Sequence, residues 1–344
     1  MHRKLILLAG VLMLVGLLGV QVTLAQDLGS ESNPIQVFFV PSVEAQVIVT
    51  GGDVMAQALE EATGLHFEVS VPTSYAATVE AMCAAPDVSM GFIPAAGYVV
   101  ASNRCGVEVG AAAVRFGWPV YWAQYIVRRD SDIFTFGDLA GKVWAYGDPG
   151  STSGFIVPSV ELQAAGIEPA STLETGGHTQ TVRAVYNGEA DFGTTFFSPP
   201  LVPGAAWRIG DSPEPYDLTV DESFLQVRDD GSTRLFVGDT RVLDARAGLR
   251  DEAPDVVDQV RVLRISQAIP NDTLSFGPEF PDELRDQIID ALTAFTATEA
   301  CLQSICSPDF YEWTGVARID DSAFDSVRLQ FEILGMTEDD VFGG

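Results

Sequence analysis

The alternation of apolar and polar residues divides the first third of the chain into short strands and helices. Residues 37–40 form an apolar run inside an expected first strand, and residues 66–71 alternate as a half-buried strand does. An amphipathic segment opened by Gly51 and Gly52 lies between them. This strand–helix order predicts a parallel sheet with right-handed crossovers. Strands are expected at residues 34–43, 66–71, 88–93, 107–116 and 121–128, and helices at 51–62, at 76–84 and from Pro94 onward.

A second α/β unit begins near Lys142. Its first strand, residues 143–146, is followed by a tight turn and a mostly apolar helical run that ends at Gly166. Further along, the pattern predicts a helix at residues 180–187, a strand at 190–194, a hairpin at 225–237, a strand at 260–266, and helices at 281–298 and 323–334.

Two α/β units joined by extended segments, with the chain returning to the first unit at its end, predict a two-lobed clamp. Each lobe is expected to be a sheet flanked by helices. The expected divisions are a signal peptide at 1–25, a first lobe at 26–126 and 263–344, and a second lobe at 127–262 with an insertion at 199–240. Ligands of open α/β sheets bind beyond the carboxyl ends of the strands. The loops expected around the cleft are 72–75, 91–95, 146–153, 176–179 and 270–273.

The N-terminus has the pattern of a secretory signal peptide. Arg3 and Lys4 precede an apolar core at residues 5–20, and Thr23 and Ala25 stand at the cleavage positions. An uncleaved membrane anchor is the alternative, although the apolar run is short for a membrane span. We therefore expect a periplasmic or otherwise extracytoplasmic, secreted protein.

The chain is strongly acidic, with 48 Asp and Glu against 19 Lys and Arg and a formal charge of −29. Loss of Arg3 and Lys4 with the signal peptide takes this charge to −31. Such a surface repels nucleic acids and anionic membranes, so neither is expected as a partner. An anionic ligand would have to be held by local donors, because hydrogen bonds to an ionised group are the strong ones.

Four cysteines, an even number in an exported chain, predict two disulfides. Proximity in the sequence favours the pairs Cys83–Cys105 and Cys301–Cys306. Neither pair has a metal-ligand spacing with a histidine, and the chain has only three histidines. No metal or other cofactor is expected.

Residues 146–155 carry the most distinctive chemistry. A strand ends there, Asp-Pro-Gly forms a tight turn, and the hydroxyl residues Ser151, Thr152 and Ser153 begin a helix. The first N–H groups of a helix have no intrahelical partner, and the helix dipole adds partial positive charge. This arrangement predicts a site for a small oxyanion.

Residues 147–158, Gly-Asp-Pro-Gly-Ser-Thr-Ser-Gly-Phe-Ile-Val-Pro, resemble the phosphonate-cradling stretch of one family of ABC importer subunits. These are the phosphonate-, phosphite- and phosphate-binding, PhnD-like type II periplasmic binding proteins. The likeness continues at residues 176–180, 187–191, 73–76 and 269–272, and covers roughly residues 34–198 and 245–335. It implies a monomeric clamp that captures a small phosphorus oxyanion and delivers it to an ABC permease in the membrane.

The resemblance also assigns roles to residues of the second lobe. Ser151, Thr152 and Ser153 would bind the phosphorus oxygens through their hydroxyls and backbone N–H groups. His178, in the loop after the next strand, would donate a further hydrogen bond.

Other residues would close the pocket around the ligand. The resemblance implies that Tyr75 and Tyr121 cover it from the first lobe, and that Asp272 faces its distal end or accepts a P–OH hydrogen. Family members that take aminoalkyl phosphonates use a further acidic residue, and this chain has Ser198 at the matching place. The resemblance therefore favours phosphite, phosphate or a small uncharged phosphonate.

Each assigned residue also has a structural alternative. The hydroxyl run could only cap a helix, and His178 could be a buried histidine with satisfied hydrogen bonds. Tyr75 and Tyr121 could be core aromatics, and Asp272 could cap a turn.

Other functions remain as alternatives. Residues 150–154 superficially resemble the nucleophile elbow of a hydrolase, but Thr152 holds the position that the elbow reserves for serine. His178 also precedes Asp191, which is the wrong order for the partners of that elbow. A hydrolase is therefore disfavoured, and no catalytic residue is assigned. An exported sensor that presents an oxyanion to a membrane receptor would use the same clamp, so the sequence leaves import and sensing open.

Overall fold

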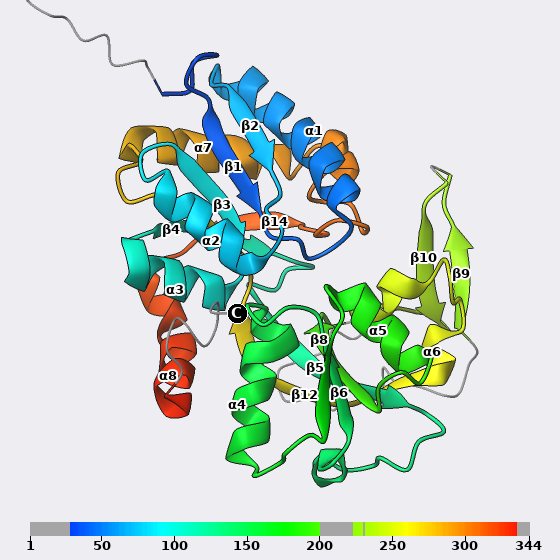
Figure 1. The fold of residues 1–344 in the computed structure, drawn as a ribbon. Coiled ribbons are helices and arrows are strands. Elements are labelled where there is room, and N and C mark those ends of the chain that lie inside the picture. Colours follow the sequence, from blue (N-terminus) through cyan, green and yellow to red (C-terminus); the bar gives the residue numbers. More distant parts are fainter. Residues whose placement is uncertain (1–27, 200–222, 230, 336–344) are drawn as a thin grey trace, which may run out of the picture.

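The computed structural model describes residues 28–199, 223–229 and 231–335, which form two lobes, each built on its own β-sheet (Figure 1). The expected signal peptide, its cleavage site and most of the expected insertion lie outside the described residues. Within these ranges, no helix combines the length and apolar character that a membrane span requires.

The first lobe holds a six-stranded sheet in the order β14-β4-β13-β3-β1-β2. Strand β1 pairs in parallel with β2 and β3, as the strand–helix order predicted, while β13, β4 and β14 add antiparallel pairings. The strands are β1 Ile35–Phe39, β2 Phe67–Ser70, β3 Ser89–Ile93, β4 Glu108–Val114, β13 Thr273–Phe276 and β14 Gly315–Arg318.

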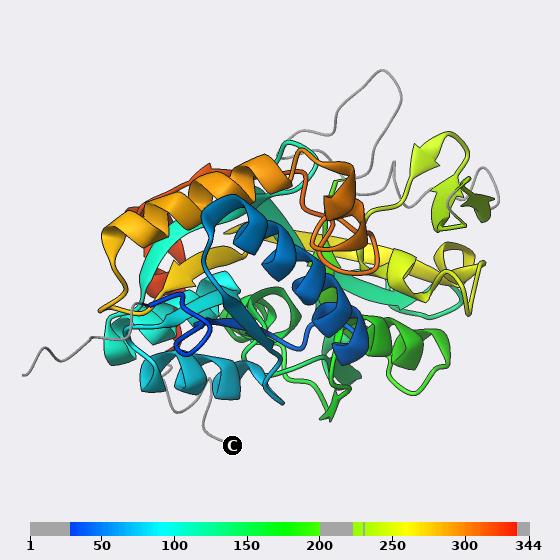
Figure 2. The ribbon, with the colours of Figure 1, turned by 90° about the horizontal axis from the view of Figure 1, so that it is seen from above.

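Helices cover both faces of this sheet. Two of them pack on one face and two on the other, as Figures 1 and 2 show. The first pair is α1 Ala45–Thr63 and α7 Asp282–Phe295, and the second is α2 Tyr75–Ala84 and α3 Ala95–Cys105. The core under α1 and α7 contains stacked rings of Phe39 and Phe92, whose centroids are 4.5 Å apart.

Helix α1 begins at Ala45, so the expected start at Gly51 is wrong. A Cβ on Gly51 would lie 2.8 Å from the ring of Phe310, and one on Gly52 would lie 2.8 Å from Val69. The two glycines therefore let the helix approach its neighbours closely, and they do not mark its first turn.

The second lobe holds a five-stranded sheet in the order β12-β5-β8-β6-β7. Strand β6 is parallel to β7 and β8, whereas β5 is antiparallel to β8 and β12. Side chains along β5 alternate between two cores, with Tyr125 on the side of α4 and Ile126 on the side of α5. The elements are β5 Val120–Arg128, β6 Val143–Tyr146, β7 Ser171–Glu174, β8 Phe192–Phe197, β12 Val260–Pro270, α4 Val157–Ala164, α5 His178–Tyr186 and α6 Val256–Gln259.

The sheets place the lobe boundaries elsewhere than expected. Residue 126 falls inside β5 and residue 263 falls inside β12, and both strands pair within the second sheet. The chain therefore crosses between the sheets at residues 115–119 and 271–272. A hydrophobic pattern identifies a strand, but it does not say which sheet the strand joins.

The predicted hairpin is present within the expected insertion. Strands β9 Ser223–Val227 and β10 Thr233–Val237 pair in antiparallel fashion, and the short β11 Thr240–Arg241 joins them. This small sheet lies beside α5 and α6 on the second lobe (Figure 1). Leu235 from β10 packs there in one core with Val182 of α5 and Val256 of α6.

The lobes are in direct contact. Helix α8, Asp325–Leu334, packs against α3 of the first lobe and α4 of the second (Figure 1). One apolar cluster continues across the lobes and includes Tyr98, Val157 and Phe324. The two lobes therefore share one apolar core at this contact.

Both predicted disulfides are confirmed. Cys83–Cys105 joins the ends of α2 and α3, and Cys301–Cys306 closes a short loop in the first lobe. The described residues contain no free cysteine.

Candidate functional site

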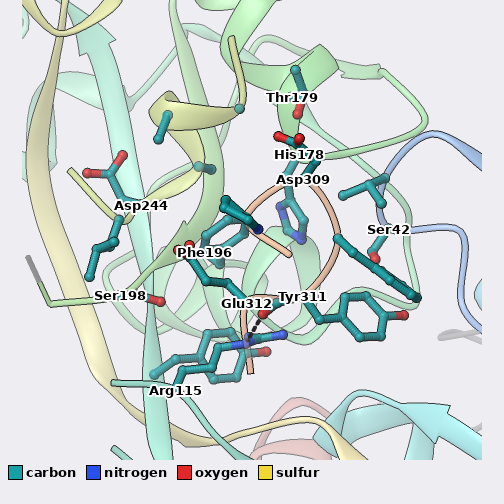
Figure 3. A pocket seen from close by; sticks show the side chains of 18 of the residues that line it. Ser42, Arg115, His178, Thr179, Phe196, Ser198, Asp244, Asp309, Tyr311 and Glu312 are labelled. Atoms are coloured by element: carbon teal, nitrogen blue, oxygen red, sulfur yellow. Dashed lines mark hydrogen bonds between the residues drawn. The ribbon is translucent and has the colours of Figure 1, made fainter. Parts of the chain in front are cut away.

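A cavity of about 280 Å³ lies between the lobes, lined by residues from both of them and from β10 (Figure 3). Six of the seven residues that the sequence singled out line it, namely Tyr75, Tyr121, Ser151, Ser153, His178 and Asp272. Ser198 also lines the cavity.

The turn before the hydroxyl run is shaped by Asp148. Its carboxylate accepts a hydrogen bond from the N–H of Gly150 at 2.7 Å, and its carbonyl accepts one from the N–H of Ser151 at 3.0 Å. Asp followed by Pro is a preferred start for a β-turn. The turn brings Ser151 to the wall of the cavity.

Ser151 caps the helix that follows. Its Oγ accepts a hydrogen bond from the N–H of Gly154 at 3.1 Å, so the capping alternative holds for this hydroxyl. The carbonyl of Ser151 accepts from both Phe155 and Ile156, which makes the first turn, Thr152–Ile156, a π turn that runs into α4. Single π turns of this kind often occur at functional sites.

Thr152 is not among the residues that line the cavity. Its side chain is fully buried, and its Oγ accepts a hydrogen bond at 2.9 Å from the N–H of Ala96, in the first turn of α3. This hydroxyl therefore links the two lobes. The backbone N–H groups of Thr152 and Ser153 lack an intrahelical acceptor because they open the helical run.

A second helix start faces the same cavity, because His178 is the first residue of α5. The glycines before it allow two loops to meet. Gly176 has a φ of +84° and donates its N–H to the carbonyl of Gly147 at 2.8 Å. A Cβ on Gly147 would lie 3.1 Å from the backbone of Gly177. Two helix N-termini thus converge on one cavity, and both favour a negative charge there.

His178 presents a neutral imidazole. Burial, together with the positive charge of Arg115, lowers its pKa to about 4. The ring meets Phe196 edge-on at 5.1 Å, and its Nδ1 is buried with no hydrogen-bond partner among the described residues. Figure 3 shows the ring directed into the cavity. A neutral imidazole offers one N–H donor and one acceptor to a ligand.

Both predicted tyrosines are buried, and they lie on opposite lobes. Tyr75 is the first residue of α2, and burial raises its pKa, with the charge of Asp148 adding to the effect. Tyr121 lies on β5, so its expected place in the first lobe is wrong. Burial and then Asp272 raise the pKa of Tyr121, while the hydroxyl of Ser153 opposes the shift. Both phenols therefore stay protonated at neutral pH.

Arg115 is a functional candidate that the sequence reasoning missed. Its Nη2 lies 2.6 Å from Oδ2 of Asp272, and its Nε donates to the carbonyl of Tyr311 at 2.8 Å. Tyr311 also lines the cavity and was missed because no motif surrounds it. A signal for Arg115 did exist. It stands at the carboxyl end of an expected strand, where ligands of such sheets bind.

A tight turn directs Arg115 into the cavity. Phe116 and Gly117 have φ values of 53° and 84°, and Arg115 and Trp118 exchange backbone hydrogen bonds at 2.9 and 3.0 Å. Positive φ at both central residues is the signature of a type I′ turn. Figure 3 shows the guanidinium reaching the cavity from the side opposite His178.

Asn271 ties the two crossover segments together. Its Nδ2 donates to the carbonyls of Ala113 at 2.9 Å and Trp118 at 2.8 Å, and its backbone N–H donates to Pro119 at 3.2 Å. Asp272 follows directly and is held against Arg115 as a result. Within the motif at residues 269–272, Asn271 therefore fixes the crossover between the sheets and Asp272 lines the cavity.

A two-lobed α/β clamp, with two helix starts of the second lobe and polar side chains of both lobes around a cavity between them, has the form of a binding protein, and its helix starts favour a negatively charged ligand. A family model described as "ABC transporter, phosphonate, periplasmic substrate-binding protein" matches residues 37–324. The chain belongs to this family. The description makes its members periplasmic substrate-binding proteins of ABC transporters.

Curated relatives match parts of the chain. The chain is 31% identical over 171 residues to the "Phosphate-import protein PhnD" of Mycolicibacterium smegmatis, covering 46% of this chain and 53% of the relative. It is 36% identical over 102 residues to the "Phosphonates-binding periplasmic protein" of Escherichia coli, covering 27% and 30%. The chain spans about half or less of the length of these relatives.

Solved structures share the fold over most of their length. A binding protein component of an ABC phosphonate transporter from Pseudomonas aeruginosa matches with a TM-score of 0.63 and 18% identity, covering 86% of this chain and 85% of that one. PhnD1 from Prochlorococcus marinus, solved with methylphosphonate, matches with a TM-score of 0.64 and 12% identity, covering 88% and 98%. These likenesses establish the type II periplasmic binding protein fold.

Proposed function

We propose that this protein captures a small phosphorus oxyanion, a phosphonate, phosphite or phosphate, for import through an ABC permease. The observation that carries the proposal is the meeting of two helix starts, at Ser151 and at His178, in one cavity between the lobes. The ligands in the names of the matched relatives, phosphate and phosphonates, support the same class.

Binding would proceed by docking and closure. The oxyanion first meets Ser151, Ser153 and the free N–H groups at the start of the helical run. Tyr75 then comes over it from the first lobe as the lobes close and exclude water, which strengthens each hydrogen bond. The closed monomer is the form that the permease would recognise, and the ligand leaves unchanged.

The pair formed by Arg115 and Asp272 supports selection of a protonatable ligand. Arg115 supplies a positive charge next to the anion, and Asp272 remains able to accept a hydrogen from a P–OH group. Sulfate carries no such proton at neutral pH and would place an oxygen against the carboxylate. We therefore expect phosphorus oxyanions to bind more tightly than sulfate.

We infer a carrier without catalysis. The middle hydroxyl of the run, Thr152, is engaged with Ala96 and does not line the cavity. Release of phosphate from a panel of phosphate esters would contradict this inference.

Loss of oxyanion uptake in cells that lack the protein separates import from sensing.

A thermal-shift and calorimetric panel tests the proposed ligand class. Methylphosphonate, phosphite, phosphate and sulfate are titrated into the secreted form of the protein. At one hundred times its Kd, a ligand should stabilise the fold by about 2.7 kcal/mol, which raises the melting temperature by several degrees. No response to any phosphorus compound would contradict the function. Equal affinity for sulfate and phosphate would contradict only the role given to Asp272.

A further inference from the structure

Arg234, on β10, is a buried arginine in the wall of the same cavity that Ser151 and Ser153 line. Its side chain is 7% exposed. Nη1 donates to the carbonyl of Thr233 at 2.8 Å and to the hydroxyl of Ser232 at 3.3 Å. Nε is buried and has no hydrogen-bond partner in the described part of the chain.

The other arginines that line the cavity each have a carboxylate partner among the described residues. These ion pairs are Arg115–Asp272, Arg183–Glu252, Arg241–Glu312 and Arg250–Asp309. No ion pair involves Arg234 within the described ranges. The chain has 48 acidic residues against 19 basic ones, so a shortage of carboxylates does not explain this unpaired cation.

The surroundings of Arg234 disfavour its positive charge. Burial lowers the pKa of its guanidinium, and the nearby charge of Arg241 lowers it further. Glu312 acts in the opposite direction but is already paired with Arg241. A buried charge without a partner destabilises a fold, and an incoming anion would remove that penalty.

The cavity also has more room than an inorganic oxyanion needs. Its 280 Å³ equal the volume of about nine water molecules at ~30 Å³ each. Phosphate has only five non-hydrogen atoms. An oxyanion on the Ser151 helix start therefore leaves space for a substituent.

We propose that Arg234 binds a second anionic group of the ligand, so that the site prefers phosphonates or phosphate monoesters whose substituent carries a carboxylate. Three observations point to this group. Nε of Arg234 has no hydrogen-bond partner and its guanidinium has no carboxylate partner in the described structure, and the cavity has spare volume. The inference rests on the proposed function, because it assumes that the phosphorus group occupies the helix starts. It departs from the expectation from the sequence, which favoured an uncharged substituent.

Calorimetry with matched ligand pairs tests the inference. Phosphonoacetate is compared with ethylphosphonate, and 3-phosphonopropionate with propylphosphonate, on the wild type, on Arg234→Gln and on Arg234→Lys. We expect the wild type to bind the better carboxylated ligand at least tenfold more tightly than its alkyl match. Arg234→Gln should lose that preference, because its affinity for the carboxylated ligands should fall at least tenfold further than its affinity for the alkyl ligands. Arg234→Lys should keep part of the preference.

Arg228→Gln is the matched control, since Arg228 is exposed next to the same hairpin turn and does not line the cavity. It should behave as the wild type. If alkylphosphonates bind but their carboxylated matches bind no more tightly, the role of Arg234 is overturned and the proposed function stands. An equal loss of both ligand types in Arg234→Gln also overturns it, since that result shows a purely structural residue. If no phosphonate or phosphate binds the wild type, the proposed function itself fails.

Discussion

Removal of the two hydroxyls that line the cavity at the start of the π turn should weaken oxyanion binding by at least a hundredfold. The variant is the double substitution Ser151→Ala and Ser153→Ala. A hydrogen bond to a charged group contributes about 1.5–3 kcal/mol, so two of them contribute about 3–6 kcal/mol. Since about 1.4 kcal/mol is a factor of ten in affinity, the lower end of this range corresponds to roughly 150-fold. The backbone N–H groups remain in the variant, so we expect the lower end.

Loss of folding stability has to be separated from loss of binding. The hydroxyl of Ser151 also caps the helix through the N–H of Gly154, and loss of such a cap costs about 1 kcal/mol of stability. Urea denaturation without ligand measures this part alone. The fold should tolerate it, because the π turn also packs against β5 and β8.

Calorimetric titration with methylphosphonate and phosphate measures the binding part. Ser159→Ala is the matched control on α4, because its hydroxyl donates to the carbonyl of Phe155 at 2.7 Å and does not line the cavity. The control should bind as the wild type does. A folded double variant whose Kd lies within threefold of the wild type would refute the reasoning, because the hydroxyls would then not be ligand donors.

Three further predictions follow from single contacts. Thr152→Val removes the acceptor for the N–H of Ala96, so we expect about tenfold weaker binding and a larger share of open molecules in small-angle scattering without ligand. The pKa of His178 is lowered from 6.5 to about 4, so the folded form binds its proton less readily than the unfolded form does. The stability from this group is therefore complete above pH 6.5 and is lost as the pH falls toward 4, about 3 kcal/mol in all, and urea melts of His178→Gln should lack this part of the pH dependence. Replacing Cys83 and Cys105 by serine opens a disulfide with a sequence separation of 22 residues and should lower the free energy of unfolding by about 3 kcal/mol, as measured by urea denaturation of the variant beside the wild type.

Local patterns were enough to predict much of the fold. The alternation of residues 66–71 and the apolar run at 37–40 identified two neighbouring parallel strands, and the turn signals at residues 229–232 identified a hairpin. Each of these signals depends only on residues that are consecutive in the sequence. The hydroxyl run after Asp148-Pro-Gly is of the same kind, since a turn and a helix start need only adjacent side chains and backbone.

The misses concern contacts between distant segments. The sequence predicted a helix start at Gly51, but this glycine lies inside the helix and makes room for the ring of Phe310, which is distant in the sequence. Thr152 was predicted to bind the ligand because it lies in a run of three hydroxyl residues, yet its hydroxyl accepts a hydrogen bond from the N–H of Ala96 on the other lobe. The pairing of Arg115 with Asp272 joins two crossover segments that lie 157 residues apart. No local pattern encodes any of these contacts.

The distances over which charges act explain how an acidic protein can hold an anion. At physiological ionic strength, charges separated by more than about 8 Å in solvent are largely screened, so most surface carboxylates contribute little inside a closed cavity. The charges that act there are those in its wall, where Arg115 offsets Asp272 and the helix starts at Ser151 and His178 add partial positive charge. Affinity is therefore decided by a few donors in the cavity wall, whereas the net charge of −29 affects the approach of the ligand. Added salt should accordingly speed association by screening the surface, and it should leave the rate of dissociation from the closed form nearly unchanged.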